Sequence, residues 1–187
     1  MTKTRLEAIT DGVTAIILTL MVLELRAPMT TNLKGLLDLK EVFMTYTISF
    51  IYIVIIWNAH HYLFSRVTKI NRRIIWANFF WIFWLSLCPF ATSWVSRDFS
   101  AFWPEFVYAV IFAMWTFSFA LIGYAAGKAN PRVKIARKRD WRNRLSIAIN
   151  LLLLTIVPFF PPVALIGRGI VALFWVLPEG WFIQKKN

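Results

Sequence analysis

The sequence has little charge, little sulfur and few of the residues that build polar active sites. Only 16% of its 187 residues are charged, nine are acidic, two are histidine and one, Cys88, is cysteine. A single cysteine excludes an intramolecular disulfide, and its position within an apolar run indicates a buried hydrophobic side chain. The few ionisable groups form no recognisable catalytic constellation. We therefore expect neither an enzyme nor a bound cofactor.

Apolar residues dominate instead, at 59% of the chain, with a mean hydropathy of +0.61. A helix of ~20 apolar residues crosses a bilayer, and lipid cannot satisfy backbone groups outside helices. We therefore predict an all-α integral membrane protein, with residues 1–187 forming one domain. Its six predicted transmembrane helices cover about 6–27, 42–64, 74–95, 103–127, 145–161 and 163–182.

The net charge of +12 raises the question of nucleic-acid binding. All but five of the 21 Lys and Arg, however, fall on the side of the membrane that holds the N-terminus; the exceptions are Arg26, Lys34, Lys40, Arg97 and Arg168. The positive-inside rule then predicts a multi-pass protein of the cell membrane with both termini in the cytoplasm. Topology explains the basicity, so we expect membrane lipids as partners and no nucleic acid. Arg168 is expected to extend its stem to the outer surface.

The first span carries a stripe that a plain lipid anchor does not need. An α-helix turns by ~100° per residue, so six of its side chains lie along one line. They comprise a charged residue at each end, a small residue, and a hydroxyl residue between branched aliphatic residues. These residues are Arg5, Gly12, Ile16, Thr19, Leu23 and Arg26. Asp11 lies within the same span, where an unpaired carboxylate costs about 2.5–3.5 kcal/mol. Pairing with Arg5, or hydrogen bonds from the second span, would offset that cost.

Polar side chains cluster at the cytoplasmic end of the second span, in the run Trp57-Asn58-Ala59-His60-His61. Such groups are costly in lipid unless they have partners, so they are expected to face protein. Adjacent histidines point ~100° apart, which favours a hydrogen-bonded network over a metal site. Asn78 on the third span is expected to join helices by hydrogen bonding. Pro89 should kink or end that helix.

Together these residues resemble the transmembrane-protein-175 family, which comprises the endolysosomal potassium channels and their prokaryotic relatives. The run Arg5-x-x-x-Ile9-Thr10-Asp11 is similar to the family signature Arg-x-x-x-Phe-Ser-Asp. Thr keeps the hydroxyl of Ser, whereas Ile lacks the aromatic ring of Phe. Further matches are Gly12-Val13-x-Ala15-Ile16-x-x-Thr19-Leu20-x-x-Leu23, Trp57-x-x-His60, Asn78 and Pro89-Phe90-x-Thr92.

The resemblance implies a homotetramer of six-helix subunits, with the first helix of each lining a central pore. It implies that Ile16 forms the narrowest apolar constriction, with Leu20 and Leu23 further along the lining. It also implies that Thr19 contributes to cation selectivity. The polar network expected to support the first helix comprises Arg5, Thr10, Asp11, Trp57, Asn58, His60 and Asn78.

A ring of Ile16 side chains would exclude water and gate the pore by dewetting. The neutral hydroxyls of Thr19 offset little of the free energy needed to remove the water around an ion. We therefore predict a partly hydrated ion and modest potassium selectivity. The predicted function is passive conduction of K⁺. The alternative is a cation- or proton-coupled secondary transporter that uses Asp11, although no paired broken helices support it. Glu24 and Asp38 either concentrate cations at the outer mouth or are solvated charges at helix ends.

Overall fold

The computed structural model describes residues 1–131 and 137–176, and the side chains of 1–131 and 144–173. Throughout these residues the regular secondary structure is helical. In chain order the helices are α1 (Lys3–Leu23), α2 (Leu33–Asp38), α3 (Lys40–Arg66), α4 (Arg72–Ser86), α5 (Cys88–Val95), α6 (Phe102–Ala129), α7 (Arg137–Ile156) and α8 (Val163–Val176).

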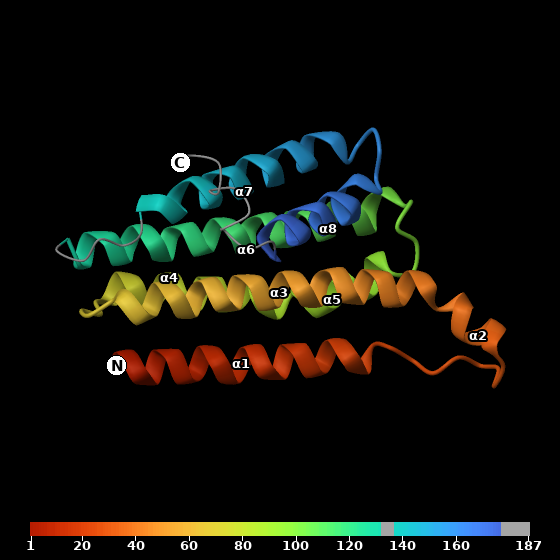
Figure 1. The fold of residues 1–187 in the computed structure, drawn as a ribbon, viewed down its shortest axis with the longest axis horizontal. Helices are drawn as coiled ribbons and strands as arrows, with labels where there is room; N and C mark the ends of the chain where they lie inside the picture. Colours follow the sequence, from red (N-terminus) through yellow and green to blue (C-terminus); the bar gives the residue numbers. More distant parts are fainter. Residues whose placement is uncertain (132–136, 177–187) are drawn as a thin grey trace, which may run out of the picture.

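The long helices lie along one axis of the molecule and alternate in direction (Figure 1). α6 occupies the centre, where it packs against α4, α5, α7 and α8. α1 runs along one edge of the bundle and packs against α3, α4 and α5. One face of α1 is therefore covered by its own subunit and the other is not.

Four spans within the described residues are long and apolar enough to cross a membrane. They are α1, α3, the segment Arg72–Val95 that contains α4 and α5, and α6. The apolar parts of the last two helices are shorter, Arg144–Ile156 and Val163–Leu173. The fifth and sixth spans therefore remain predictions, and the end of the sixth, beyond 176, lies outside the described residues.

Two predicted span ends are wrong by several residues. α1 ends at Leu23 and not at 27, because the chain turns there, with Leu25 N–H bonded to the Val22 carbonyl at 3.0 Å. α7 ends at Ile156 and not at 161, and is followed by turns before Pro161 and Pro162. Proline has no N–H and cannot continue a helix from within it.

The third predicted span is broken where expected. α4 ends at Ser86 and α5 begins at Cys88, with Pro89 in the first turn of α5. That position tolerates proline, because the first N–H groups of a helix have no partner within it. α4 begins at the other side of the membrane with a side-chain cap, in which Asn71 Oδ1 accepts from Ile74 N–H at 3.0 Å.

The core lies between α3, α4 and α6 and is largely aromatic. The rings of Trp81 and Trp115 have centroids 5.5 Å apart, and Tyr52 meets the edge of Trp115 at 6.0 Å. One expectation is overturned in this core. Arg168, predicted to reach the outer surface, is fully buried, because its polar partners are provided inside the bundle and not by solvent.

Candidate functional site

The uncovered face of α1 is apolar and carries the predicted pore residues. Ile16 is 60% exposed, Leu20 47% and Leu23 74%. The opposite face is buried against α3, α4 and α5 and consists of Leu6, Thr10, Thr14, Ile17 and Met21. The structure therefore divides α1 into an anchored face and a face open to another chain or to lipid.

Thr19 lies on the exposed face, one turn along from Ile16. Its hydroxyl donates to the backbone carbonyl of Ile16 at 2.7 Å. A hydroxyl carries one hydrogen and two lone pairs, and here the hydrogen is committed to the helix. Thr19 consequently presents acceptor lone pairs, which suit a cation or the water around it.

Behind the exposed face, α1 is joined to α4 and α3 by a buried chain of polar side chains. Asn78 Nδ2 donates to Thr10 Oγ1 at 2.9 Å, and Thr10 in turn donates to the Leu6 carbonyl at 2.9 Å. The Oδ1 atom of Asn78 lies 2.7 Å from His60 Nε2. Because Asn78 uses its amide nitrogen on Thr10, His60 must be the donor, which fixes its proton on Nε2.

The ring of His60 is held from both faces. It stacks on Phe64 with centroids 4.3 Å apart and on Trp81 with centroids 4.8 Å apart. Those contacts fix the plane of the imidazole, so that Nε2 points at Asn78. A single orientation of His60 thus links α3 to α4, and through Asn78 to α1.

A second contact joins α1 to α3 nearer the surface. Trp57 Nε1 donates to Asp11 Oδ1 at 2.8 Å. This gives the carboxylate a charge-assisted partner, a stronger kind of hydrogen bond than one between neutral groups. The structure thus brings together five of the predicted network residues, Thr10, Asp11, Trp57, His60 and Asn78.

Two predicted network residues are not joined to it. Arg5 and Asn58 are exposed, and within the described part of the chain neither has a side-chain hydrogen bond or ion pair with the network. Arg5 and Asp11 are six positions apart on a helix, and only side chains three or four apart lie side by side. The partner of Asp11 is therefore Trp57, from another helix.

This site lies within the part of the chain that matches a known family. The model of the endosomal/lysosomal potassium channel TMEM175 family matches residues 5–89, which include all but the first two residues of α1 and every residue of the network. A potassium channel of Chryseobacterium sp. (strain P1-3) is 37% identical over 182 residues, covering 96% of this chain and 95% of the relative. The chain belongs to the TMEM175 family.

Two further comparisons extend over most of the chain. A potassium channel of Streptomyces collinus is 25% identical over 185 residues, covering 91% of this chain and 90% of the relative. The crystal structure of a lysosomal potassium-selective channel TMEM175 homolog from Chamaesiphon minutus superposes with a TM-score of 0.83. It is 24% identical and covers 92% of this chain and 95% of that one, which shows a shared fold. As predicted from its motifs, this is a prokaryotic member of the TMEM175 family.

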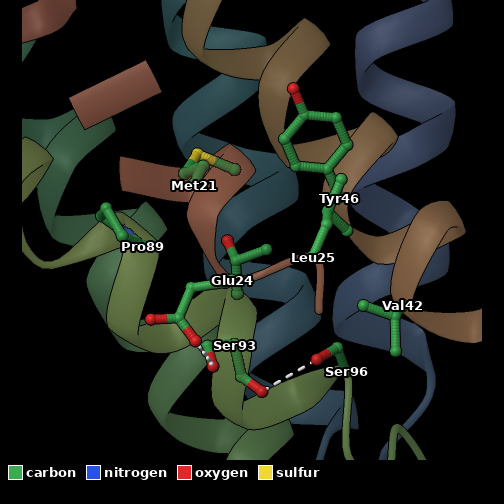
Figure 2. Close-up of a pocket in the computed structure, with 9 residues that line it drawn as sticks. Met21, Glu24, Leu25, Val42, Tyr46, Pro89, Ser93 and Ser96 are labelled. Carbon is green, nitrogen blue, oxygen red and sulfur yellow. Dashed lines mark hydrogen bonds between the residues drawn. The ribbon is translucent and has the colours of Figure 1, made fainter. Parts of the chain in front are cut away.

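Three contacts in this TMEM175-family protein were not predicted from the sequence. The first involves Glu24, which follows the end of α1. Ser93 on α5 donates to Glu24 Oε2 at 2.7 Å (Figure 2). The carboxylate lies beside a small pocket between α1, α3 and α5 that Met21, Tyr46 and Pro89 help to line. Glu24 thus has a partner in its own subunit, whereas Asp38 is simply exposed at the end of α2.

The second is Asn130, which follows the C-terminal end of α6. Its Oδ1 accepts from Thr68 N–H at 3.1 Å, Thr68 Oγ1 at 3.0 Å and Lys69 N–H at 2.8 Å. Its Nδ2 donates to the carbonyls of Lys69 at 3.1 Å and Ala126 at 2.9 Å. One side chain therefore ties the loop between α3 and α4 to α6. The available signal was an asparagine directly after a long apolar helix.

The third joins Glu105 on α6 to α8, where Glu105 Oε2 accepts from the Leu165 N–H at 3.1 Å. Glu105 is fully buried, as is Arg168 on the next turn of α8. No local pattern connects residues so far apart in the chain.

Proposed function

We propose that this TMEM175-family protein is a potassium channel in which four copies of α1 surround a central pore. The observation that carries the proposal is the exposed, apolar face of α1 on a helix whose opposite face is anchored. Closed cyclic symmetry repeats one such face around an axis, and one copy of this chain has too few polar groups to enclose a water path. Both relatives are named as potassium channels, which supports the same conclusion.

In this arrangement Ile16 forms the gate. Four branched aliphatic side chains facing one axis make a constriction that water leaves readily, and an apolar constriction blocks ions without a mechanical plug. Leu20 and Leu23 continue the lining towards the outer end of α1. All three side chains are exposed in the single subunit, so no rearrangement of its core is needed to bring them to the axis.

Thr19 supplies the polar ring of the pore. Because its hydrogen is held by the Ile16 carbonyl, four Thr19 side chains direct oxygen lone pairs towards the axis. These oxygens accept hydrogen bonds from water around the ion and attract the ion itself. Neutral hydroxyls offset only part of the hydration energy of a cation, so the ion passes partly hydrated and the preference for potassium is modest.

The polar network sets the orientation of α1. Its two contacts, Asp11 with Trp57 and Thr10 with Asn78, fix the helix against α3 and α4 from different sides. A rotation of α1 about its axis would break both. The network is therefore a support that holds Ile16 and Thr19 towards the axis, and Asp11 acts in it as a hydrogen-bond acceptor.

Reconstituted full-length protein in a planar bilayer tests this function. With potassium on one side and sodium on the other, we expect a reversal potential displaced towards that of potassium and unaffected by replacing chloride with gluconate. Absence of current, or current carried by chloride, would overturn the proposal. Potassium accumulation driven by a pH gradient, and lost in Asp11→Asn, would establish the coupled transporter instead.

The assembly is tested separately. Native mass spectrometry should give the mass of four 21.8 kDa chains. In a Cys88→Ala background, Ile16→Cys should form intersubunit disulfides under mild oxidation, whereas Ile17→Cys, buried on the anchored face, should not. Cross-linking at Ile17 and not at Ile16 would show that the wrong face of α1 had been assigned to the axis.

A further inference from the structure

Arg168 is the most unusual residue of the described bundle, since it is a charged side chain with no exposed surface. It lies on α8, where that helix packs against α3, α6 and α7 (Figure 1). Charged groups inside membrane helices are costly and are found where specific partners compensate them. The partners of Arg168 form hydrogen bonds with only part of its guanidinium group.

One nitrogen of Arg168 is fully engaged. Nη1 donates to the Tyr52 hydroxyl at 3.3 Å and to Oδ1 of Asn150. The guanidinium carbon also lies 4.9 Å from the ring centroids of both Tyr52 and Phe112, and 5.9 Å from that of Tyr108. Aromatic faces attract a cation, and more strongly when the pair is out of water.

The other two nitrogens are not engaged. Nε and Nη2 are buried and have no hydrogen-bond partner among the described residues. Together they form one straight edge of the planar guanidinium, the edge that can hold two oxygen lone pairs side by side. A buried donor left without a partner destabilises the fold, and a charged donor does so more strongly. This edge of Arg168 is therefore suited to bind an oxygen acceptor.

Glu105, on the neighbouring helix α6, has an open acceptor atom that complements these open donors. Its Oε2 accepts from the Leu165 N–H at 3.1 Å, and Leu165 is three residues before Arg168 on α8. Its Oε1 is buried and has no partner within the described chain. On α6, Glu105 is followed one turn later by Tyr108, whose ring faces the guanidinium. The carboxylate and the guanidinium therefore share one interior region.

No ion pair within 4.0 Å joins Glu105 and Arg168 in the described residues. A polar contact over a longer distance commonly passes through water. One water molecule matches the three open positions, because it accepts two hydrogen bonds and donates others. It would accept from Nε and Nη2 of Arg168 and donate to Oε1 of Glu105.

We propose that each subunit holds a structural water molecule between Glu105 and the Nε–Nη2 edge of Arg168, forming a water-bridged ion pair that fastens α8 to α6. This site is separate from the face of α1. The bridge gives each open atom a partner. The short helix α8 depends on it, because the pair connects it to the central helix of the bundle.

A structure of the full-length protein at a resolution that shows ordered water tests the site directly. We expect a density peak about 2.7–3.2 Å from Glu105 Oε1 and from both Arg168 nitrogens. A direct contact between carboxylate and guanidinium, or side chains in place with no peak, would overturn the proposal. So would an anomalous signal at the peak in crystals grown with bromide, which would identify a halide site.

Thermal unfolding of purified protein at one scan rate tests the pairing. Removing one partner of a buried pair leaves the other charge uncompensated, so Arg168→Met and Glu105→Gln should each lower the midpoint by on the order of 10 °C. The double variant should recover at least half of the loss caused by Arg168→Met. Arg97→Met, at an exposed position, is the control and should move the midpoint by less than about 2 °C.

The double variant separates pairing from packing. If Glu105→Gln and Arg168→Met simply add, the two side chains act independently and the bridge is disproved. If neither single variant lowers the midpoint, the pair does not fasten α8. Because these readouts do not involve conduction, they stand apart from any failure of the channel proposal.

Discussion

The hydroxyl of Thr19 and the carbonyl of Ile16 are joined by a hydrogen bond of 2.7 Å, so the predicted selectivity residue and the predicted gate share one contact. The bond fixes the rotamer of Thr19 and turns its lone pairs away from the helix. It also satisfies a second acceptor position on the Ile16 carbonyl, beside the bond within the helix. The chemistry of the pore face therefore depends on where this one hydrogen lies.

Thr19→Val keeps the shape of the side chain and removes its oxygen. We expect the permeability ratio of potassium over sodium to fall about fivefold, since one modest hydrogen bond is worth about 1 kcal/mol. Reversal potentials under bi-ionic conditions measure the ratio. Thr19→Ser is the matched control and should retain most of it, and an unchanged ratio in Thr19→Val would remove Thr19 from selectivity.

Ile16→Asn places a polar group at the constriction, where it would hold water. We expect potassium conductance at fixed voltage to rise severalfold, because a wetted constriction no longer excludes ions. Single-channel recording gives the value. Ile170→Asn is the control, at a position 64% exposed on α8 and away from α1. Equal effects of the two substitutions would show that Ile16 does not form the gate.

Asn78→Ala leaves both His60 and Thr10 with one hydrogen bond fewer in a buried place. Each buried group that loses its partner costs about 1–3 kcal/mol. For a chain of this length we expect the thermal midpoint in detergent to fall by roughly 5–10 °C. Asn58→Ala changes an exposed asparagine on α3 and should leave the midpoint unchanged. A similar fall in both would contradict the network.

Trp57→Phe removes the donor to Asp11 and keeps an aromatic ring. The contact is near the surface, so we expect a loss of about 1 kcal/mol and a fall in the midpoint of about 2–4 °C. Asp11→Ala should have a similar effect. The thermal midpoint of the double variant should be no lower than that of the less stable single variant, because both substitutions remove the same hydrogen bond. Additive losses would show that Asp11 has another partner.

Local patterns in the sequence predicted much of this fold. Apolar runs located the long helices, and the break at Pro89 followed from a ring that blocks helix continuation. The exposed stripe on α1 followed from helical periodicity, since Ile16, Thr19 and Leu23 lie on one line. Helix ends were harder, because the turn after Leu23 depends on local hydrogen bonds that hydropathy does not record.

Contacts between distant segments were not predictable in the same way. The polar partners of the buried Arg168 are Tyr52 and Asn150, which come from two other helices. In the sequence, Arg168 is near the predicted outer end of a short span, which indicated only that its side chain could reach solvent. The spacing of Arg5 and Asp11, by contrast, already argued against their pairing, since helical neighbours are three or four residues apart.

The amide of Asn130 has a mechanical consequence at the end of the bundle where α6 ends. Because this side chain follows α6 directly and binds the loop after α3, a displacement of α6 either carries that loop along or ruptures the four hydrogen bonds to Thr68 and Lys69 at once. α3, α4 and α6 are thereby coupled as one block, to which α1 is attached separately through the Asp11–Trp57 and Thr10–Asn78 hydrogen bonds.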